Sequence, residues 1–230
     1  MKNINYSIFI VRGYSVKIVD VKTLAIPAIK VIRFGRFGDN RGYFSEPFRK
    51  SDLLTNPDIP FMHGVEFVQA NESLSKKNVL RGLHFQWNPY MGKLVRTIRG
   101  RMVDIVLDIR KNSPTFGNII AYDMPCDLNA DYSDWIWVPP GFAHGNFFTE
   151  ESMIEYFCSG EYSPGCEAGI SPMASDLDWS LCDADMKQLF DEVTHASDFT
   201  ISEKDQNGLS LTAWQHDERS NNFLYETLSD

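Results

Sequence analysis

The sequence predicts an all-β sandwich or barrel with few helices. Short segments rich in β-branched and aromatic residues recur along most of the chain, with turn residues between them. A clear helical pattern is confined to one segment near the C-terminal end. Closely spaced strands without intervening helices favour a sandwich or barrel over alternating βα units.

Ten segments have the composition of strands, at residues 28–34, 43–48, 65–70, 79–86, 93–99, 101–110, 118–122, 135–138, 145–149 and 152–158. The most regular is 101–110, where apolar residues recur at every second position from Val103 to Ile109. A period of two predicts a strand with one face on the core. Arg99 and Gly100 supply the turn that joins this strand to the preceding one.

One helix is predicted over residues 183–193, because Asp183 is a suitable N-cap and an apolar stripe runs from Met186 to Val193. Residues 50–55 have the pattern of a short helical turn. The last stretch, 217–230, is polar apart from residues 223–225, so it is either a docked tail or a frayed end.

Charge and hydropathy exclude several classes of protein. The chain has 230 residues with 22 Lys and Arg against 31 Asp and Glu, and its net charge of −9 would repel a nucleic acid backbone. No apolar run approaches the roughly 20 residues of a membrane helix. The apolar stretch at 6–11 is too short for a signal peptide, so we expect a cytoplasmic protein whose four cysteines are free thiols.

Two segments contain motifs that point to a fold family. Residues 139–144 read P-P-G-F-A-H after a β-rich run, which resembles the second half of a cupin signature. Metal-binding cupins carry H-x-H and a downstream glutamate in the first half. Here those positions read His84-Phe85-Gln86 and Tyr90. Because a divalent metal needs three or four well-placed ligands, we expect a cupin without a metal.

Further motifs resemble the dTDP-4-dehydrorhamnose 3,5-epimerase family, whose members are cofactor-free jelly-roll cupins that act on nucleotide-linked 4-keto sugars. In family order these are D-x-R-G-x-F-x-E at 39–46, Q-x-N at 69–71, RGLHFQ at 81–86, GKLVR at 92–96, SPTFG at 113–117, PPGFAHG at 139–145, tyrosines at 156 and 162, PGCEAGI at 164–170 and SEKD at 202–205. The resemblance implies a single cupin-type jelly-roll domain with a core over about 26–205. Residues 1–25 would form an N-terminal strand or extension, and residues 206–230 a C-terminal tail.

The resemblance also assigns roles that suit the chemistry of a 4-ketone. Such a ketone acidifies the hydrogens at C3 and C5, so epimerisation needs a base on one face, an acid on the other and a cation near the oxygen. By resemblance His84 is the base, Asp205 orients it, Tyr156 is the acid and Lys93 stabilises the enolate oxygen. A neutral imidazole accepts a proton near pH 7, and a phenol holds one there.

The remaining site residues are predicted, by resemblance, to hold the nucleotide sugar. Arg41 and Arg81 would bind the diphosphate, because a guanidinium pairs well with phosphate oxygens. Tyr162 would stack on the nucleotide base. The pocket would be completed by Glu46, Gln69, Asn71, His144 and Glu167, and His144 has a second possible role as a donor to a sugar oxygen.

We therefore expect an epimerase acting at C3, C5 or both of a nucleotide-linked 4-keto-6-deoxy sugar, in the biosynthesis of deoxysugars and surface polysaccharides such as O-antigen. The alternatives are a single-site epimerase or ketoisomerase on another nucleotide sugar, a metal-dependent cupin oxygenase or isomerase, and a non-catalytic sugar-binding cupin. The resemblance further implies a homodimer whose N-terminal strands cross between subunits.

Overall fold

The structure is a computed structural model and describes residues 17–228. The stretch at 6–11 and most of the predicted N-terminal extension lie outside the described residues. The strands are β1 (Ile18–Thr23), β2 (Lys30–Gly35), β3 (Phe37–Asp39), β4 (Gly42–Phe44), β5 (Gln69–Ser75), β6 (Val79–Gln86), β7 (Lys93–Arg99), β8 (Arg101–Asp108), β9 (Ile119–Pro125), β10 (Tyr132–Val138), β11 (Phe142–Phe148), β12 (Ser152–Cys158), β13 (Glu167–Gly169) and β14 (Thr200–Ile201). The helices are α1 (Lys50–Thr55), α2 (Ala184–Thr194), α3 (Glu203–Gln206), α4 (Leu211–His216) and α5 (Tyr225–Leu228), with 3₁₀ turns at Pro60–Met62 and Glu218–Asn222.

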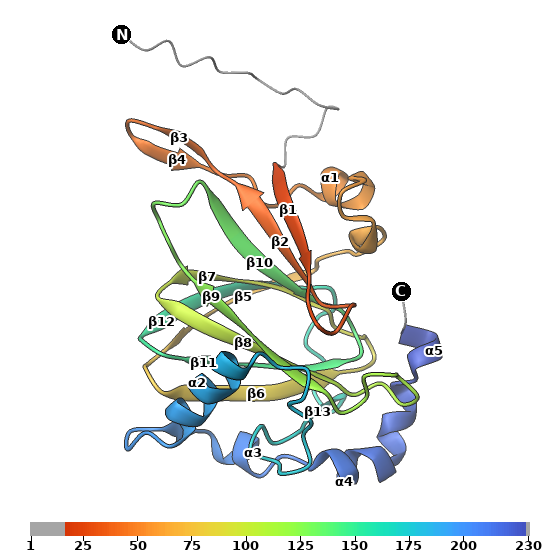
Figure 1. Ribbon diagram of the computed structural model, residues 1–230. Coiled ribbons are helices and arrows are strands. Elements are labelled where there is room, and N and C mark those ends of the chain that lie inside the picture. Colours follow the sequence, from red (N-terminus) through yellow and green to blue (C-terminus); the bar gives the residue numbers. More distant parts are fainter. Residues whose placement is uncertain (1–16, 229–230) are drawn as a thin grey trace.

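The strands form the two packed sheets of a cupin-type jelly roll, which confirms the predicted fold class (Figure 1). One sheet has the order β1-β2-β10-β7-β12-β5, and the other has the order β13-β6-β11-β8-β9 with β14 paired to β6. The hairpin β3–β4 stands apart as a separate two-stranded ribbon. Neighbouring strands such as β8 and β11, β7 and β12, and β8 and β9 pair antiparallel, whereas β14 pairs with β6 in parallel.

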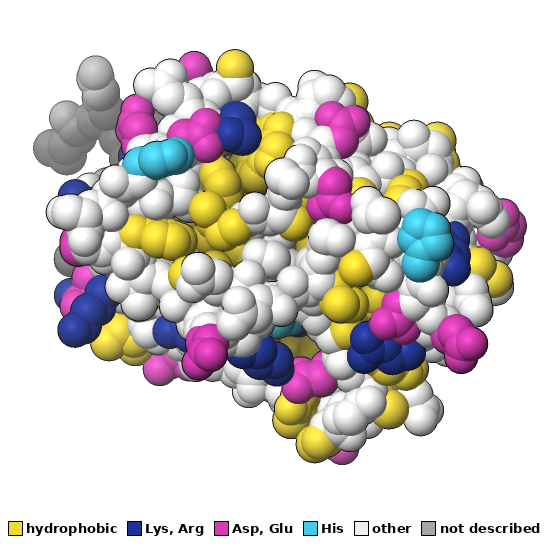
Figure 2. Space-filling model, turned by 90° about the horizontal axis from the view of Figure 1, so that it is seen from below, with side chains coloured by type: hydrophobic (Ala, Val, Ile, Leu, Met, Phe, Trp, Pro, Cys, Tyr) yellow, Lys and Arg dark blue, Asp and Glu magenta, His cyan; other side chains and the backbone are white. Residues whose placement is uncertain are grey.

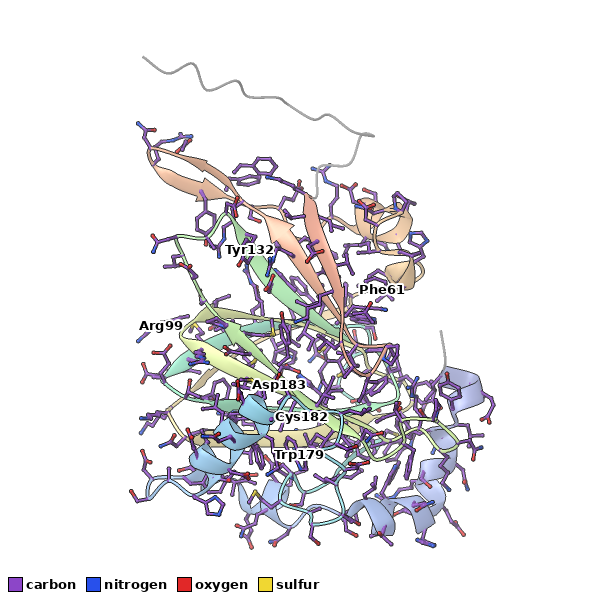
Figure 3. The ribbon with its side chains drawn as sticks, viewed as in Figure 1. Phe61, Arg99, Tyr132, Trp179, Cys182 and Asp183 are labelled. Carbon is purple, nitrogen blue, oxygen red and sulfur yellow. The ribbon has the colours of Figure 1, made fainter. Side chains whose placement is uncertain are left out.

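Three apolar clusters hold these layers together. Between the sheets, residues such as Val95 and Ile136 meet Val106 and Phe148. A second cluster packs the outer face of the β6–β11–β8 sheet against α2 and α4, and the indole of Trp179 lies 4.8 Å from the Phe190 ring at this contact (Figure 3). A third covers the outer face of the other sheet with α1 and the Pro60–Met62 turn. Both sheets are therefore covered on their outer faces as well as between them.

Strand β8 is buried on both faces, although the sequence predicted that only one face would lie on the core. Both faces of the strand are buried, because α2 and α4 cover the side turned away from the sandwich. The polar residues Asp104 and Asp108 lie on the other face, which they share with Met102 and Val106 of the core between the sheets, and both are fully buried. Asp108 is satisfied by Arg110, Ser113 and other donors of the following turn.

Several elements differ from the sequence prediction. The strand expected at 65–70 is displaced to β5, where pairing with β12 sets the register, while Phe67 packs on Trp137 outside the sheet. β3, β13, β14 and the C-terminal helices were not predicted, whereas β1 lies in the stretch 1–25 for which a strand or extension was expected. The C-terminal segment is docked as far as residue 228, because Trp214 and Phe223 are fully buried against the second sheet. The helix predicted at 183–193 is confirmed, with Asp183 as its cap.

Candidate active site

His84 and Asp205 meet although 121 positions separate them in the sequence. His84 lies on β6, and Asp205 lies in the single turn of α3, which the pairing of β14 with β6 brings beside that strand. The His84 Nε2 to Asp205 Oδ1 distance is 2.7 Å. The second carboxylate oxygen accepts a hydrogen bond from the backbone N–H of Gly82 at 3.1 Å. These two bonds fix the carboxylate, and the bond to Nε2 leaves Nδ1 as the nitrogen open to a ligand.

The environment keeps the Asp205 carboxylate ionised. Burial by itself would raise its pKa, but hydrogen bonds from His84, from the Gly82 backbone and from Ser202 outweigh that effect and lower the pKa below its ordinary value. A fixed, ionised carboxylate favours the neutral imidazole tautomer with its hydrogen on Nε2, and it stabilises an imidazolium once a proton arrives.

Gly82 allows strands β6 and β11 to approach closely beside this pair. Its φ is +109°, and a Cβ placed there would lie 2.6 Å from the Cα of Gly145 on β11. The register between the strands shifts at this point, so that His84 lies opposite His144. Only glycine combines this backbone conformation with so close a contact.

Lys93 and Tyr156 approach the same space from the opposite sheet. They lie on β7 and β12, where Tyr156 pairs with Val95 and Cys158 pairs with Lys93. Burial lowers the pKa of the Lys93 ammonium, against the attraction of Cys158, Asp104 and Glu167. Burial raises the pKa of the Tyr156 phenol, so this group stays protonated at neutral pH.

Two cavities join at these side chains. The larger has a volume of about 590 Å³ and the smaller about 420 Å³, and His84, Lys93 and Tyr156 line both. Figure 2 shows the molecule from the side of the second sheet, with a hollow in which histidine and apolar atoms are visible between acidic and basic side chains. A ring held at the junction would have an imidazole, an ammonium and a phenol around it.

Four predicted binding residues line the smaller cavity, namely Gln69, Asn71, Tyr162 and Glu167. Tyr162 is 54% exposed at the rim, and its hydroxyl donates to Glu167 at 3.0 Å. Lys204, which was not predicted, donates to the same Glu167 oxygen at 3.1 Å. The larger cavity contains Arg81, whose Nε donates to Ser75.

A second histidine–carboxylate pair lies in the wall of the larger cavity. His144 Nε2 is 2.7 Å from Asp104 Oδ2, and both side chains are buried. Asp104 was not predicted as a site residue, because its position in an alternating strand was taken as the face away from the core. The available signal was that Asp104 shares its face of the strand with the apolar residues Met102 and Val106.

Gln86, which occupies a ligand position of metal-binding cupins, has a structural role in this chain. Its side-chain N–H groups donate to the carbonyls of Pro89 and Glu161, and its oxygen accepts from the backbone N–H of Ser163. The amide therefore ties the loop before β7 to the loop after β12. Within residues 17–228, no three His, Cys, Asp or Glu side chains are grouped so that they could hold a metal ion.

Two predicted residues, Arg41 and Glu46, do not reach either cavity of their own chain. Arg41 lies at the tip of β3–β4 and pairs with Asp39 at 2.6 Å, while Glu46 pairs with Arg49 at 2.8 Å. Figure 1 shows this hairpin at the top of the molecule, whereas β6 and α3 lie at the bottom. The structure thus brings ten of the twelve predicted residues to the described cavities or their immediate surroundings and leaves these two apart.

Comparison with known proteins gives concordant matches over most of the chain. The family model for dTDP-4-dehydrorhamnose 3,5-epimerase matches residues 23–213. The enzyme of that name from Shigella flexneri is 39% identical over 158 residues, which are 67% of this chain and 83% of the relative.

Solved structures agree with these matches. A dTDP-6-deoxy-D-glucose-3,5-epimerase from Legionella pneumophila, in complex with dTDP-4-keto-L-rhamnose, superposes with a TM-score of 0.70 at 29% identity and covers 89% of this chain and 97% of its own. A dTDP-4-dehydrorhamnose 3,5-epimerase from Sulfolobus tokodaii superposes with a TM-score of 0.65 at 34% identity and covers 84% of this chain and 95% of its own.

Proposed function

This chain belongs to the dTDP-4-dehydrorhamnose 3,5-epimerase family, and we propose that it inverts C3, C5 or both of a dTDP-linked 4-keto-6-deoxy sugar through an enolate. The observation that carries this proposal is the junction of the two cavities, where His84, Lys93 and Tyr156 converge. A base, a cation and an acid around one ring are what inversion next to a ketone requires.

His84 removes the proton from the carbon next to the ketone. Its Nδ1 is the free nitrogen, because Nε2 is held by Asp205 at 2.7 Å. The imidazolium that forms lies beside an ionised carboxylate, which lowers the energy of the charged intermediate. Removal and return of a proton leave the oxidation state of the sugar unchanged, so this step requires no redox partner.

Lys93 and Tyr156 complete the inversion from the other sheet. The Lys93 ammonium stabilises the negative charge that develops on the C4 oxygen, and a cation held in a dry site is more effective there than in water. Tyr156 delivers a proton to the opposite face of the enolate carbon. The raised pKa of its phenol keeps that proton in place until the enolate forms.

The nucleotide lies across the smaller cavity and its rim. Tyr162, half exposed beside Glu167, offers a ring on which the base stacks, while Gln69 and Asn71 supply amides below it. Arg81 provides a guanidinium for the diphosphate from the β6 side. These side chains would concentrate positive charge and hydrogen-bond donors at the site against the net acidity of the chain.

We further propose a homodimer in which β3–β4 of one subunit brings Arg41 and Glu46 to the site of its partner. The support is the exposed aromatic surface of this hairpin, where Phe37 is 50%, Tyr43 47% and Phe44 65% exposed. Apolar side chains on a projecting ribbon favour a protein partner. Sedimentation should show a dimer that F44E converts to a monomer; a wild-type monomer would exclude this arrangement.

Other expectations are also carried forward as proposals. We propose a single domain over the whole chain, a cytoplasmic location and a role in surface polysaccharides such as O-antigen. The docking of Trp214 and Phe223 on the second sheet supports the single domain. No helix within residues 17–228 is long and apolar enough to cross a membrane.

The test is the reaction of the purified protein with dTDP-4-keto-6-deoxyglucose in deuterated water, followed by NMR. We expect deuterium at C3, C5 or both, together with an inverted product, and no exchange with H84A. Exchange at one centre only would select the single-site epimerase. Absence of exchange on dTDP-, GDP- and CDP-linked 4-keto sugars would reject the proposal and leave a sugar-binding or metal-dependent cupin.

A further inference from the structure

The segment that follows α4 packs against the loop that joins β6 to β7. It comprises residues 218–228 and lies beyond residue 213, where the family match ends, so the family resemblance gives it no role. The loop, residues 87–92, leads from the strand of His84 to the strand of Lys93. Contact between the two therefore links the C-terminal segment to the strands that carry two of the proposed catalytic groups.

Phe223 makes the central contact of this packing. Its side chain is fully buried, and its ring lies 5.3 Å from that of Phe85, 6.2 Å from that of Trp87 and 5.8 Å from that of Tyr90, measured between centroids. The Tyr90 hydroxyl also donates to the carbonyl of Asn222 at 2.6 Å. Edge-to-face aromatic pairs stabilise beyond the area that they bury, so these contacts fix Trp87 and Tyr90 on the segment.

The segment itself is anchored on the turn that follows β8. The backbone N–H of Lys111 donates to the carbonyl of Phe223 at 2.7 Å, and the N–H of Tyr225 donates to the carbonyl of Lys111 at 2.9 Å. The Lys111 ammonium donates to the side-chain oxygen of Asn221 at 2.9 Å. These bonds flank Phe223 along the chain, so the segment offers the loop a fixed support.

The loop forms part of the wall of the smaller cavity, where the nucleotide is proposed to lie. Gln86 and Met91, at its two ends, both line that cavity. Gln86 also donates to the carbonyl of Pro89 at 3.0 Å. Because Met91 follows Tyr90 directly and consecutive Cα atoms are about 3.8 Å apart, a shift of Tyr90 off its support would carry Met91 with it. The shape of the nucleotide cavity thus depends on the C-terminal segment.

Lys93 is held in place by other contacts. It pairs in the sheet with Val138 on β10 and with Cys158 on β12. The preceding residue, Gly92, donates its N–H to the Ser159 hydroxyl at 2.7 Å and accepts at its carbonyl from the Ser159 N–H at 2.9 Å. Loosening the loop should therefore disturb the wall of the nucleotide cavity and leave the ammonium in position.

We propose that Phe223 is a positioning residue for nucleotide binding, which holds residues 87–91 where Gln86 and Met91 form the wall of the smaller cavity. Phe223 itself lines neither of the two cavities. This proposal rests on the proposed function, which places the nucleotide in the smaller cavity. Loss of the Phe223 side chain should weaken nucleotide binding and raise KM while kcat changes little, because the groups that act on the sugar keep their places.

The test compares wild type, F223A and F190A, each as the full chain. Phe190 is the matched control, because it is buried in the same apolar cluster but its ring partners are Phe147 and Trp179, which do not belong to the loop. Titration calorimetry gives the Kd of dTDP, and deuterium exchange into dTDP-4-keto-6-deoxyglucose gives KM and kcat. We expect F223A to raise Kd and KM about tenfold with kcat within about twofold, and F190A to keep all three within about twofold of wild type.

The control variant separates positioning from general destabilisation. F223A and F190A should both melt below wild type, since each leaves a cavity in the same cluster. If F223A does not fold, Y90F replaces it; this variant keeps the ring and removes only the hydrogen bond to Asn222, and it should raise the Kd of dTDP about two- to tenfold.

Three results would overturn the role of Phe223 and leave the epimerase intact. They are a wild-type Kd and KM in the variant of the segment or loop, an equal rise of Kd and KM in F190A, and a loss confined to kcat. A wild type that exchanges none of the 4-keto sugars would instead reject the proposed function and the role of Phe223 with it.

Discussion

Replacement of Asp205 by Asn tests the histidine–carboxylate pair with little change of shape. The Asn side-chain oxygen can still accept the hydrogen bond from the Gly82 N–H, which is 3.1 Å from the carboxylate in wild type. The change removes the negative charge that lies 2.7 Å from His84 Nε2. It also offers an amide N–H to that nitrogen, which would place the imidazole hydrogen on Nδ1 and disable the base.

The expected loss of turnover follows from the hydrogen bond between His84 and the Asp205 carboxylate that the substitution removes. A hydrogen bond to a charged group contributes about 1.5–3 kcal/mol. If that contribution is made to the imidazolium in the transition state, turnover falls about 10- to 150-fold, at about 1.4 kcal/mol per tenfold. The wrong tautomer adds to this loss, and in serine proteases the corresponding change costs about 10⁴ in kcat.

The assay is the initial rate of deuterium exchange at C3 and C5, with the melting temperature as a check on folding. D183N is the matched control, because Asp183 caps α2 through Asp185 and Asn is an equally good cap. D205N should lose at least about tenfold in kcat, and D183N should match wild type. A D205N enzyme within a factor of about three of wild type would refute the role of the pair.

Two further predictions concern Lys93 and Gln86. K93M should lower kcat by at least about 10²-fold, as expected when a group that stabilises an oxyanion is removed. Because burial lowers the pKa of Lys93 in the folded state, the unfolded chain holds this proton more tightly. The free energy of unfolding should therefore rise as the pH increases through the folded pKa. Calorimetry across pH should show that rise in wild type and its loss in K93M, which should also melt at a higher temperature at neutral pH. Q86A removes three hydrogen bonds between two loops and should cost about 2–4 kcal/mol of stability in urea unfolding, and a loss below about 0.5 kcal/mol would contradict this structural role.

The strand pattern and the site motifs could be predicted from the sequence because both depend on local order. β7 and β12 begin and end where the β-rich composition of 93–99 and 152–158 indicated. The meeting of His84 and Asp205 could not be derived from spacing, since it depends on β14 pairing in parallel with β6. It was predicted only through resemblance to a family.

Other features depend on packing that a single sequence does not reveal. The inward carboxylate of Asp104 looked like a solvent-facing residue, because the alternation of β8 does not show that helices cover the Val103 face while the opposite sheet covers the Asp104 face. The buried aromatic residues of the C-terminal segment follow too short a pattern for a helix prediction. Gln86 looked like a lost metal ligand, and only the structure shows the two loops that it joins.

His84 and Tyr156 are proposed to act on opposite faces of the same sugar ring. The decisive measurement follows deuterium exchange and inversion together, at the same carbon, in wild type, H84A and Y156F. Wild type should show both events and H84A neither. Y156F should show exchange with retained configuration, because His84 still removes the proton and returns a deuteron to the same face. Inversion by Y156F at the wild-type rate would show that Tyr156 does not deliver the proton to the opposite face.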